Sequence, residues 1–452
     1  MEIFFLGATG TVTGSKYLVS SGPTKILIDC GLFQGFKQLR LRNWERLPVD
    51  LAELSAVILT HAHIDHSGYL PILVKQGYKG KIYCSAATRE LCSILLPDSG
   101  RLQEEQAGYA NRHKFSKHKP ALPLYTQEDA ELSLLQLVAV DFEQEISIGS
   151  EVKVRLYPAG HIPGAASVEV RDAQTSIIFS GDLGRPDDPI MNPPMPLQGA
   201  DYLVLESTYG NRVHPVEDAQ KLLGDIINRT AERGGVVVIP AFAVGRTQML
   251  LHYIRLLKDA GTIPDLPVFL NSPMAVNATD IFVSHHLEHR LSLQQCEAAC
   301  NVAKIVRTAD DSKALNRRKG PMVIIAGSGM ATGGRVVHHL KEFAPDPRNT
   351  ILFAGFQAEG TRGAAMLNGA KSIKIHGEDV PVLAQVESIE GLSAHADYVQ
   401  ILDWLKQMKH APRRVFVTHG EQTAAEAMVR HIEEVLHWDA HVPEYMEIVQ
   451  LK

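Results

Sequence analysis

Apolar and polar residues alternate in two different ways along the chain. In the first part, short apolar runs separated by glycine-rich or polar turns predict successive β-strands. From about residue 211, helical periodicity alternates with short buried runs, which is typical of an α/β unit. The pattern predicts strands at 3–6, 15–19, 25–29, 56–60, 81–84, 152–157, 176–180, 203–205, 236–239, 268–270, 322–326, 351–355, 382–389 and 414–418, and helices at 87–111, 216–232, 246–259, 335–343, 359–367, 399–408 and 424–436.

The predicted strand 56–60 leads directly into a run of the form His-x-His-x-Asp-His. In an extended chain His61 and His63 point to the same side, while Asp65 and His66 follow where the chain turns toward a helix. The first pair therefore suits one metal ion and the second pair another. A zinc ion needs three or four protein ligands, so further ligands must come from distant parts of the chain.

Other predicted strands also finish at polar residues that can bind a metal. His161 and Asp182 follow strand ends beside glycines, and Glu206 follows the run 203–205. Each alone is more often a turn residue, but together they indicate that a sheet sandwich delivers such side chains to one edge. Asp29 closes the strand 25–29, where it either orients the histidines from behind or caps a turn, and spacing alone leaves both open.

Near the end of the chain, two further predicted strands lead to His395 and His419. Between them and the first region lies the glycine-rich segment 327–334, followed by the predicted helix 335–343. Such a loop offers free backbone N–H groups to phosphate, although a tight strand–helix turn would look the same. The segment lacks the Gly-Lys-[Ser/Thr] of a P-loop, which argues against nucleotide hydrolysis.

Composition narrows the class of protein. A chain of 452 residues is expected to form more than one domain. The net charge of −6 argues against bulk affinity for nucleic acid, although it leaves room for a local basic groove. The odd number of Cys, five, and the absence of Cys-x-x-Cys indicate reduced thiols. Without a basic leader or a long apolar run, a cytoplasmic protein is expected.

These motifs together resemble those of the β-CASP nucleases in the metallo-β-lactamase superfamily. The His-x-His-x-Asp-His run with His161, Asp182 and His419 resembles the ligand set of that superfamily. Glu206, His395 and His419 resemble the β-CASP motifs A, B and C. The segments 240–248 and 327–330 are further hallmarks of the group.

The resemblance covers essentially the whole chain and is strongest to prokaryotic ribonucleases related to the mRNA 3′-end cleavage endonuclease. It implies an α/β fold, in which an αββα metallo-β-lactamase sandwich is interrupted by an inserted α/β β-CASP domain. The sandwich is expected at 1–209 and 384–452, and the insert at 210–383.

The resemblance also implies two zinc ions in the metal centre. One is expected to be held by His61, His63 and His161, the other by Asp65, His66 and His419, with Asp182 bridging both. The carboxylates Asp65 and Asp182 thereby count as catalytic residues.

By the same resemblance His395 is expected to be the general acid, oriented by Glu206. RNA phosphates are expected to contact Arg246 and the residues Gly327, Ser328, Gly329 and Met330. The implied function is zinc-dependent hydrolysis of RNA in RNA processing or decay. Cleavage is expected to be endonucleolytic, and the resemblance also allows 5′–3′ exonuclease activity and a homodimer, without a membrane partner.

Two alternatives stay open. One is a DNA nuclease or small phosphodiesterase of the same fold, and the other is a non-catalytic RNA-binding subunit. DNA-processing relatives typically carry Val where this chain has His419, which favours RNA. The complete ligand set argues against a non-catalytic subunit. Thioester or lactam hydrolysis is disfavoured because those enzymes lack the insert and motif B.

Overall fold

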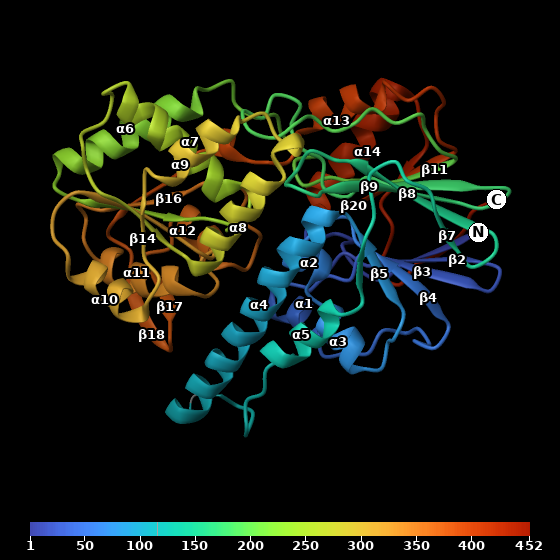
Figure 1. The fold of residues 1–452 in the computed structure, drawn as a ribbon, viewed down its shortest axis with the longest axis horizontal. Helices are drawn as coiled ribbons and strands as arrows, with labels where there is room; N and C mark the ends of the chain where they lie inside the picture. Colours follow the sequence, from blue (N-terminus) through green and yellow to red (C-terminus); the bar gives the residue numbers. More distant parts are fainter. Residues whose placement is uncertain (115) are drawn as a thin grey trace. The chain divides into compact units, whose positions relative to one another are not determined.

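A computed structural model describes residues 1–114 and 116–452 (Figure 1). The chain forms two compact units, and its path crosses from one to the other twice. The first unit comprises Met1–Val213 and His395–Lys452, and the second comprises His214–Ala394. Among the described residues, no helix is both long enough and apolar enough to cross a membrane.

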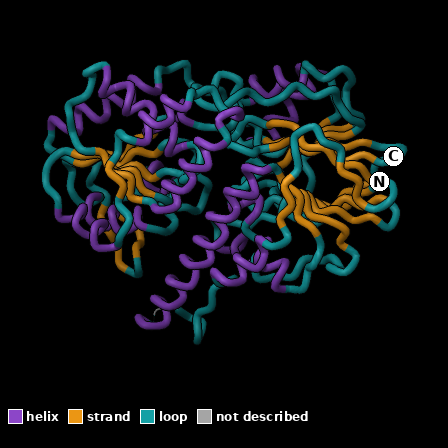
Figure 2. Tube along the Cα trace, in the orientation of Figure 1, coloured by secondary structure: helices purple, strands orange, loops and turns teal. Residues whose placement is uncertain are grey.

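The first unit contains two seven-stranded sheets within the described residues, and Figure 2 shows them as two facing layers of strands. The first sheet has the order β22 (Ile448–Gln450), β1 (Glu2–Phe5), β2 (Tyr17–Ser21), β3 (Thr24–Ile28), β4 (Leu54–Ile58), β5 (Lys81–Cys84) and β6 (Leu137–Ala139). The second has the order β21 (Ala440–His441), β20 (Arg414–Thr418), β11 (Tyr202–Glu206), β10 (Ser176–Phe179), β9 (Ala166–Arg171), β8 (Val152–Pro158) and β7 (Ile146–Ile148).

The two sheets are held together by the apolar residues that alternate along their strands. Phe5, Ile28, Val168 and Phe416 belong to one buried cluster that draws side chains from both sheets. The outer face of the second sheet packs against helices near the end of the chain, where Leu203 and Trp404 share a second cluster. The helices of this unit are α1 (Lys37–Arg42), α2 (Ile64–Ser67), α3 (Leu70–Lys75), α4 (Ala86–His113), α5 (Gln127–Leu134), α13 (Tyr398–Leu405) and α14 (Gln422–Leu436).

The strand directions bring several loops to one edge of the sandwich. In the second sheet β10, β11 and β20 are parallel neighbours, so their carboxyl ends lie together. β8 and β10 are both antiparallel to β9, so β8 also ends at this edge. In the first sheet β3, β4 and β5 are parallel. The predicted αββα sandwich is confirmed, and its strand ends carry the polar residues singled out above.

The second unit has a six-stranded sheet in its described residues, and every neighbouring pair in it is parallel. Its order is β14 (Lys304–Ile305), β13 (Val268–Asn271), β15 (Met322–Ala326), β12 (Val236–Pro240), β16 (Thr350–Phe353) and β19 (Gln385–Ser388). A hairpin of β17 (Ser372–Ile375) and β18 (Glu378–Pro381) is separate. The helices are α6 (Ala219–Glu232), α7 (Arg246–Asp259), α8 (Pro273–Ser284), α9 (Leu293–Cys300), α10 (Ala309–Arg317), α11 (Arg335–Phe343) and α12 (Arg362–Leu367).

Several local features differ from the sequence expectations. The predicted strand 382–389 is shorter in the structure, where β19 covers only Gln385–Ser388. Since β19 pairs with β16, the chain stays in the second unit until Ala394 rather than leaving it at 383. The helices α8, α9 and α10 were not expected. Their starts are marked by Ser272, Ser292 and Thr308, each of which accepts a hydrogen bond from a first-turn N–H.

Candidate metal centre

Seven predicted ligands meet within the first unit. His61 and His63 follow β4, and Asp65 and His66 lie in the short helix α2, which begins directly after His63, rather than on an open turn. The remaining three come from the loops after β8, β10 and β20, namely His161, Asp182 and His419. The shared edge of the parallel strands thus brings together residues that are far apart in the sequence.

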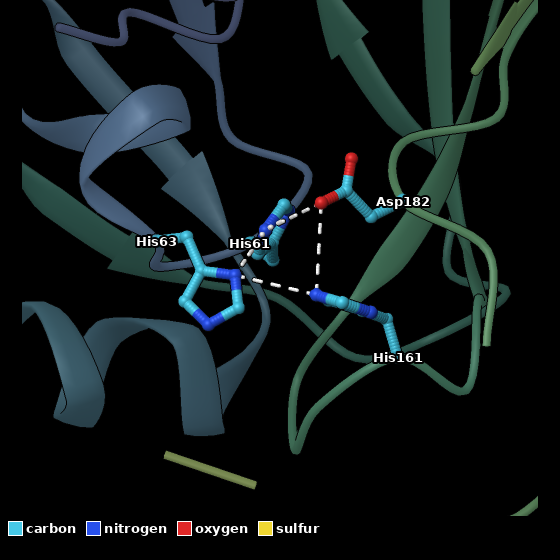
Figure 3. Close-up of side chains that lie close together, drawn as sticks. All are labelled: His61, His63, His161 and Asp182. Atoms are coloured by element: carbon cyan, nitrogen blue, oxygen red, sulfur yellow. Dashed lines mark hydrogen bonds and ion pairs between the residues drawn. The ribbon is translucent and has the colours of Figure 1, made fainter. Parts of the chain in front are cut away.

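The first donor set consists of His61, His63, His161 and Asp182 (Figure 3). The Nδ1 of His63 lies 3.0 Å from Nε2 of His61 and 3.3 Å from Nε2 of His161. The Oδ2 of Asp182 lies 3.4 Å from Nε2 of His61 and 3.6 Å from Nε2 of His161. One atom from each residue therefore points at a common centre.

These separations suit a tetrahedral zinc ion. Bonds of about 2.0–2.1 Å in a tetrahedron place neighbouring ligand atoms roughly 3.3 Å apart. The four separations in the first donor set run from 3.0 to 3.6 Å. Three imidazoles and one carboxylate are also among the ligand types that zinc prefers.

The second donor set consists of Asp65, His66 and His419. The Nε2 atoms of His66 and His419 are 3.1 Å apart, and Oδ2 of Asp65 lies 3.5 Å from Nε2 of His419 and 3.9 Å from Nε2 of His66. The other oxygen of Asp182, Oδ1, lies 3.2 Å from Nε2 of His66. The two oxygens of Asp182 thus face different donor sets, the arrangement expected of a shared ligand.

The protonation of the two donor sets differs. Burial lowers the pKa of His61 well below its usual value and that of His63 to about 4, so both rings are neutral and can donate a lone pair. Burial also disfavours the charged form of His66, but Asp182 and Asp29 outweigh it and raise the pKa of His66 well above the usual value. Burial alone would raise the pKa of Asp182, yet the nearby His419, His66 and His61 hold that pKa well below the usual range.

Further side chains fix the ligands from behind. Asp29 lies with Oδ2 2.7 Å from Nδ1 of His66, and it accepts hydrogen bonds from the backbone N–H and hydroxyl of Thr60. The hydroxyl of Thr208 lies 3.2 Å from Nδ1 of His419. Asp29 therefore occupies the orienting position that the sequence left open, whereas Thr60 and Thr208 were not predicted. Their only signal was a hydroxyl within two residues of a motif residue at the end of an apolar run.

Asp29 and His419 share an unusual backbone conformation. Their φ angles are 57° and 49°, in the left-handed region that costs free energy for residues other than glycine. Both side chains are nevertheless locked into the site by the contacts given above. Strain that persists at a cluster of polar residues is typical of functional sites.

Glu206, which is buried, and His395, which is partly exposed, form a pair beside the donor sets. Nδ1 of His395 lies 3.2 Å from both carboxylate oxygens of Glu206, so its ring N–H donates to the carboxylate. Glu206 is held in turn by the backbone N–H of Leu183, at 2.6 Å, and of Thr208, at 3.3 Å. Nε2 of His395 lies on the metal side, 3.9 Å from Oδ2 of Asp182.

The environment of His395 favours its charged form. Burial alone would lower its pKa, but the charge and the hydrogen bond of Glu206 reverse that effect and raise the pKa above the usual value. The sequence suggested that a strand leads directly to His395, but in the structure it does not. His395 follows a short 3₁₀ turn at Glu390–Leu392, forms an isolated bridge with Gly184, and precedes Asp397, which caps α13.

The residues predicted to contact phosphate lie in the second unit. The ends of β12 and β15 are paired, Pro240 with Ala326, which brings the segment before Arg246 and the segment Gly327–Met330 to one edge of that sheet. Arg246 begins α7 but is buried, with Nη1 3.6 Å from Sδ of Met249. Ser328 is partly exposed, with its hydroxyl 3.0 Å from that of Thr332. Contact with RNA remains a prediction for these residues.

Models of known families match most of the chain. Residues 9–226 match the metallo-beta-lactamase superfamily, 247–366 match the Beta-Casp domain, and 379–443 match a Zn-dependent metallo-hydrolase RNA specificity domain. A protein from Enterococcus faecalis of unknown function has a similar structure, with a TM-score of 0.53 at 15% identity over 100% of this chain and 99% of the other. That similarity concerns the fold alone.

Curated relatives match over nearly the full length of this chain. Ribonuclease TTHA0252 from Thermus thermophilus is 35% identical over 93% of this chain and 94% of its own. Transcription termination factor FttA from Methanosarcina mazei is 32% identical over 100% of this chain and 72% of its own. The protein of the same name from Methanocaldococcus jannaschii is 29% identical, again over 100% and 72%. The chain therefore belongs to the β-CASP family of the metallo-β-lactamase superfamily.

Proposed function

We propose that this chain is a zinc-dependent ribonuclease that hydrolyses phosphodiester bonds within RNA. The observation that carries the proposal is the convergence of two donor sets on the two oxygens of Asp182, beside the pair of His395 and Glu206. A phosphodiester hydrolase needs positive charge at the phosphate, an activated water and a proton donor for the leaving oxygen. Each requirement has named candidates within one unit.

RNA is the proposed substrate for two reasons. The family model for an RNA specificity domain covers 379–443, which includes His395 and His419, and one relative is named a ribonuclease. His419 also stands where DNA-processing relatives typically carry Val, as noted from the sequence. Exonuclease trimming from the 5′ end, a role in RNA processing or decay, a homodimer and a cytoplasmic location stay predictions.

Two zinc ions are proposed to bind, one by His61, His63 and His161 and one by Asp65, His66 and His419, with Asp182 shared. When bound, such ions supply positive charge to the phosphate and lower the pKa of a water molecule. The neutral rings of His61 and His63 and the ionised carboxyl of Asp182 are already in the protonation states that ligands require.

His395 is proposed to protonate the leaving ribose oxygen. Because Nδ1 donates to Glu206, the proton available for transfer is the one on Nε2, which lies on the metal side. The raised pKa of His395 favours the protonated ring that carries this proton. Glu206 acts through His395, because its oxygens are occupied by that ring and by two backbone N–H groups.

A circular RNA tests the proposal directly, because only an endonuclease opens a circle. Purified protein with measured zinc content would be incubated with labelled circular and linear RNA, and with a DNA of the same sequence. We expect two zinc ions per chain, conversion of the circle to linear products and little cleavage of DNA. Equal cleavage of DNA, or intact circles beside degraded linear RNA, would contradict the proposed substrate or mode of cleavage.

A further inference from the structure

The first unit contains a small recess away from the metal centre. It encloses a volume of about 20 Å³, and none of the seven donor residues lines it. A cavity of that size holds one or two water-sized groups, so the recess suits only a small ligand. Its lining includes Lys16, Phe33, Arg42, Arg46, Tyr69 and Tyr445, and we call it the Lys16 recess.

Lys16 is an unusual residue to find in such a lining. It is 2% exposed, and its ammonium donates to the carbonyls of Gly14 and Gly31 and lies 4.5 Å from the ring centroid of Phe33. Within the described part of the chain, no carboxylate lies close enough to form an ion pair with it. Burial lowers the pKa of Lys16 to about 8, which reflects the cost of a buried charge without a counter-ion. An ammonium has three N–H donors, so the two carbonyls leave one for another acceptor.

Two arginines add positive charge at the same recess. The guanidinium of Arg42 lies 3.8 Å from the ring centroid of Tyr445 and 5.4 Å from that of Phe33, so it is held between aromatic rings. Stacking orients the planar group while leaving its edge N–H donors for a ligand. Arg46 is exposed, and Glu45 is the one carboxylate in the lining. Three cationic side chains thus face a single anionic one.

We propose that the Lys16 recess binds a single phosphate group, either as inorganic phosphate or as the terminal phosphate of a small nucleotide. A phosphate offers several oxygens to a compact ammonium and to the fork of a guanidinium, which this recess places together. It would also supply the counter-charge that the buried ammonium of Lys16 lacks. The competing explanation is that Lys16 only ties the loops at Gly14 and Gly31 together.

A ligand here would contact the scaffold behind the metal centre. Gly31, one acceptor of Lys16, packs so closely against Asp65 that a Cβ at residue 31 would lie 1.5 Å from the Asp65 carbonyl oxygen. Ser15 donates its backbone N–H to the same carbonyl, at 2.9 Å. The site therefore adjoins the short helix α2, which carries the predicted ligand Asp65, while it remains separate from the reacting atoms.

Calorimetric titration of the zinc-loaded protein tests the proposal, with inorganic phosphate, AMP and adenosine as probes. Arg42→Gln should weaken one phosphate-binding event roughly tenfold or more, because charge-assisted hydrogen bonds are lost. Arg40→Gln is the matched control, since Arg40 lies on the same helix α1 but outside the lining, and it should change binding less than about twofold. Phosphate bound at the zinc ions would be equal in both variants.

The probes separate the two sources of phosphate. Adenosine should not bind; AMP binding more tightly than phosphate points to a nucleotide, and phosphate binding alone points to the free ion. Equal affinities for phosphate in Arg42→Gln and Arg40→Gln would overturn the proposal, as would binding of adenosine as tight as that of AMP. Lys16→Met should show the same loss. If that variant does not fold, a crystal soaked with tungstate gives the second readout, with anomalous density expected beside Lys16 and its absence counting against the site.

Discussion

The first donor set is drawn from residues 61–182, whereas the second combines Asp65 and His66 with His419 near the other end of the chain. In the first, His61 and His63 are two residues apart and His161 follows 98 residues after His63. In the second, His66 and His419 are separated by 353 residues. The first also presents two histidines with lowered pKa values, His61 and His63, while His66 in the second has a raised one. The comparison teaches that the two sets differ in how they hold protons: the raised pKa of His66 favours a proton at the second set, whereas the lowered pKa values of His61 and His63 disfavour one at the first.

Replacing the shared ligand should damage both donor sets at once. In Asp182→Asn the amide cannot supply two anionic oxygens, so we expect RNA cleavage to fall by about three orders of magnitude or more. Zinc content measured by elemental analysis should fall as well. Thermal unfolding monitored by circular dichroism should still be cooperative, because the core lies between the sheets. Normal cleavage by Asp182→Asn would show that the carboxylate is not shared.

Replacing His395 should leave both donor sets intact and remove only the proton donor. His395→Ala should lose roughly 10²–10⁴-fold in rate on RNA, whose leaving ribose oxygen needs a proton. On bis-p-nitrophenyl phosphate the loss should be much smaller, because p-nitrophenolate is a good leaving group. Glu206→Gln should follow the same pattern more weakly. Equal losses on both substrates, or loss of zinc, would place His395 in metal binding instead.

Asp29 distinguishes the two sets, because it lies directly against His66 of the second set, whereas it reaches His61 of the first set only through the hydroxyl of Thr60. Asp29→Asn should therefore weaken zinc at the second set by about 10–100-fold, the usual effect of losing a carboxylate behind a ligating histidine. Competition with a chelator, followed by zinc analysis, should reveal one ion released early and one retained. Simultaneous release of both ions would mean that Asp29 supports the whole centre. Asp172→Asn, on an exposed turn, is the control and should release zinc like the wild type.

Lowering the pH should also distinguish the two sets. The expected effect is smaller than those of the substitutions, namely a fall in zinc content from two ions per chain to one. A raised pKa means that His66 binds its proton tightly, and as the pH falls that proton displaces zinc from the second set first. His63, whose pKa is lowered to about 4, stays neutral until much lower pH, so zinc in the first set should persist. Zinc analysis after dialysis at stepwise lower pH checks this order. A single step that removes both ions would show that the sets are not distinguishable by protonation.

The sequence allowed much of the site to be predicted, because its ligands sit at the ends of apolar runs. His161 and Asp182 could be predicted for that reason. The parallel order of the strands then brings the strand ends to one edge of the sheet. Thr60 and Thr208 could not be predicted, since a hydroxyl gains its role only from the tertiary neighbour it meets. The Lys16 recess had no sequence signal for the same reason.

The fold shows the same division between local and tertiary information. The strand-rich first part and the α/β alternation after residue 211 followed from the two hydrophobic patterns, whereas the sandwich with an inserted domain followed from the family resemblance. The second crossing between units was harder to place, because β19 belongs to the insert only through its pairing with β16. The short strand has four residues and an exposed or half-buried pattern, so nothing in its own sequence distinguishes the two units. Pairing partners of short strands are decided by the rest of the sheet.

The position of β20 has a consequence for the order of events during synthesis. This strand lies between β11 and β21 inside the second sheet and precedes His419. On the ribosome the whole insert therefore emerges before the sandwich receives an internal strand and the last residue of its second donor set. A nascent chain that stops before residue 414 lacks His419 and therefore cannot assemble the second donor set.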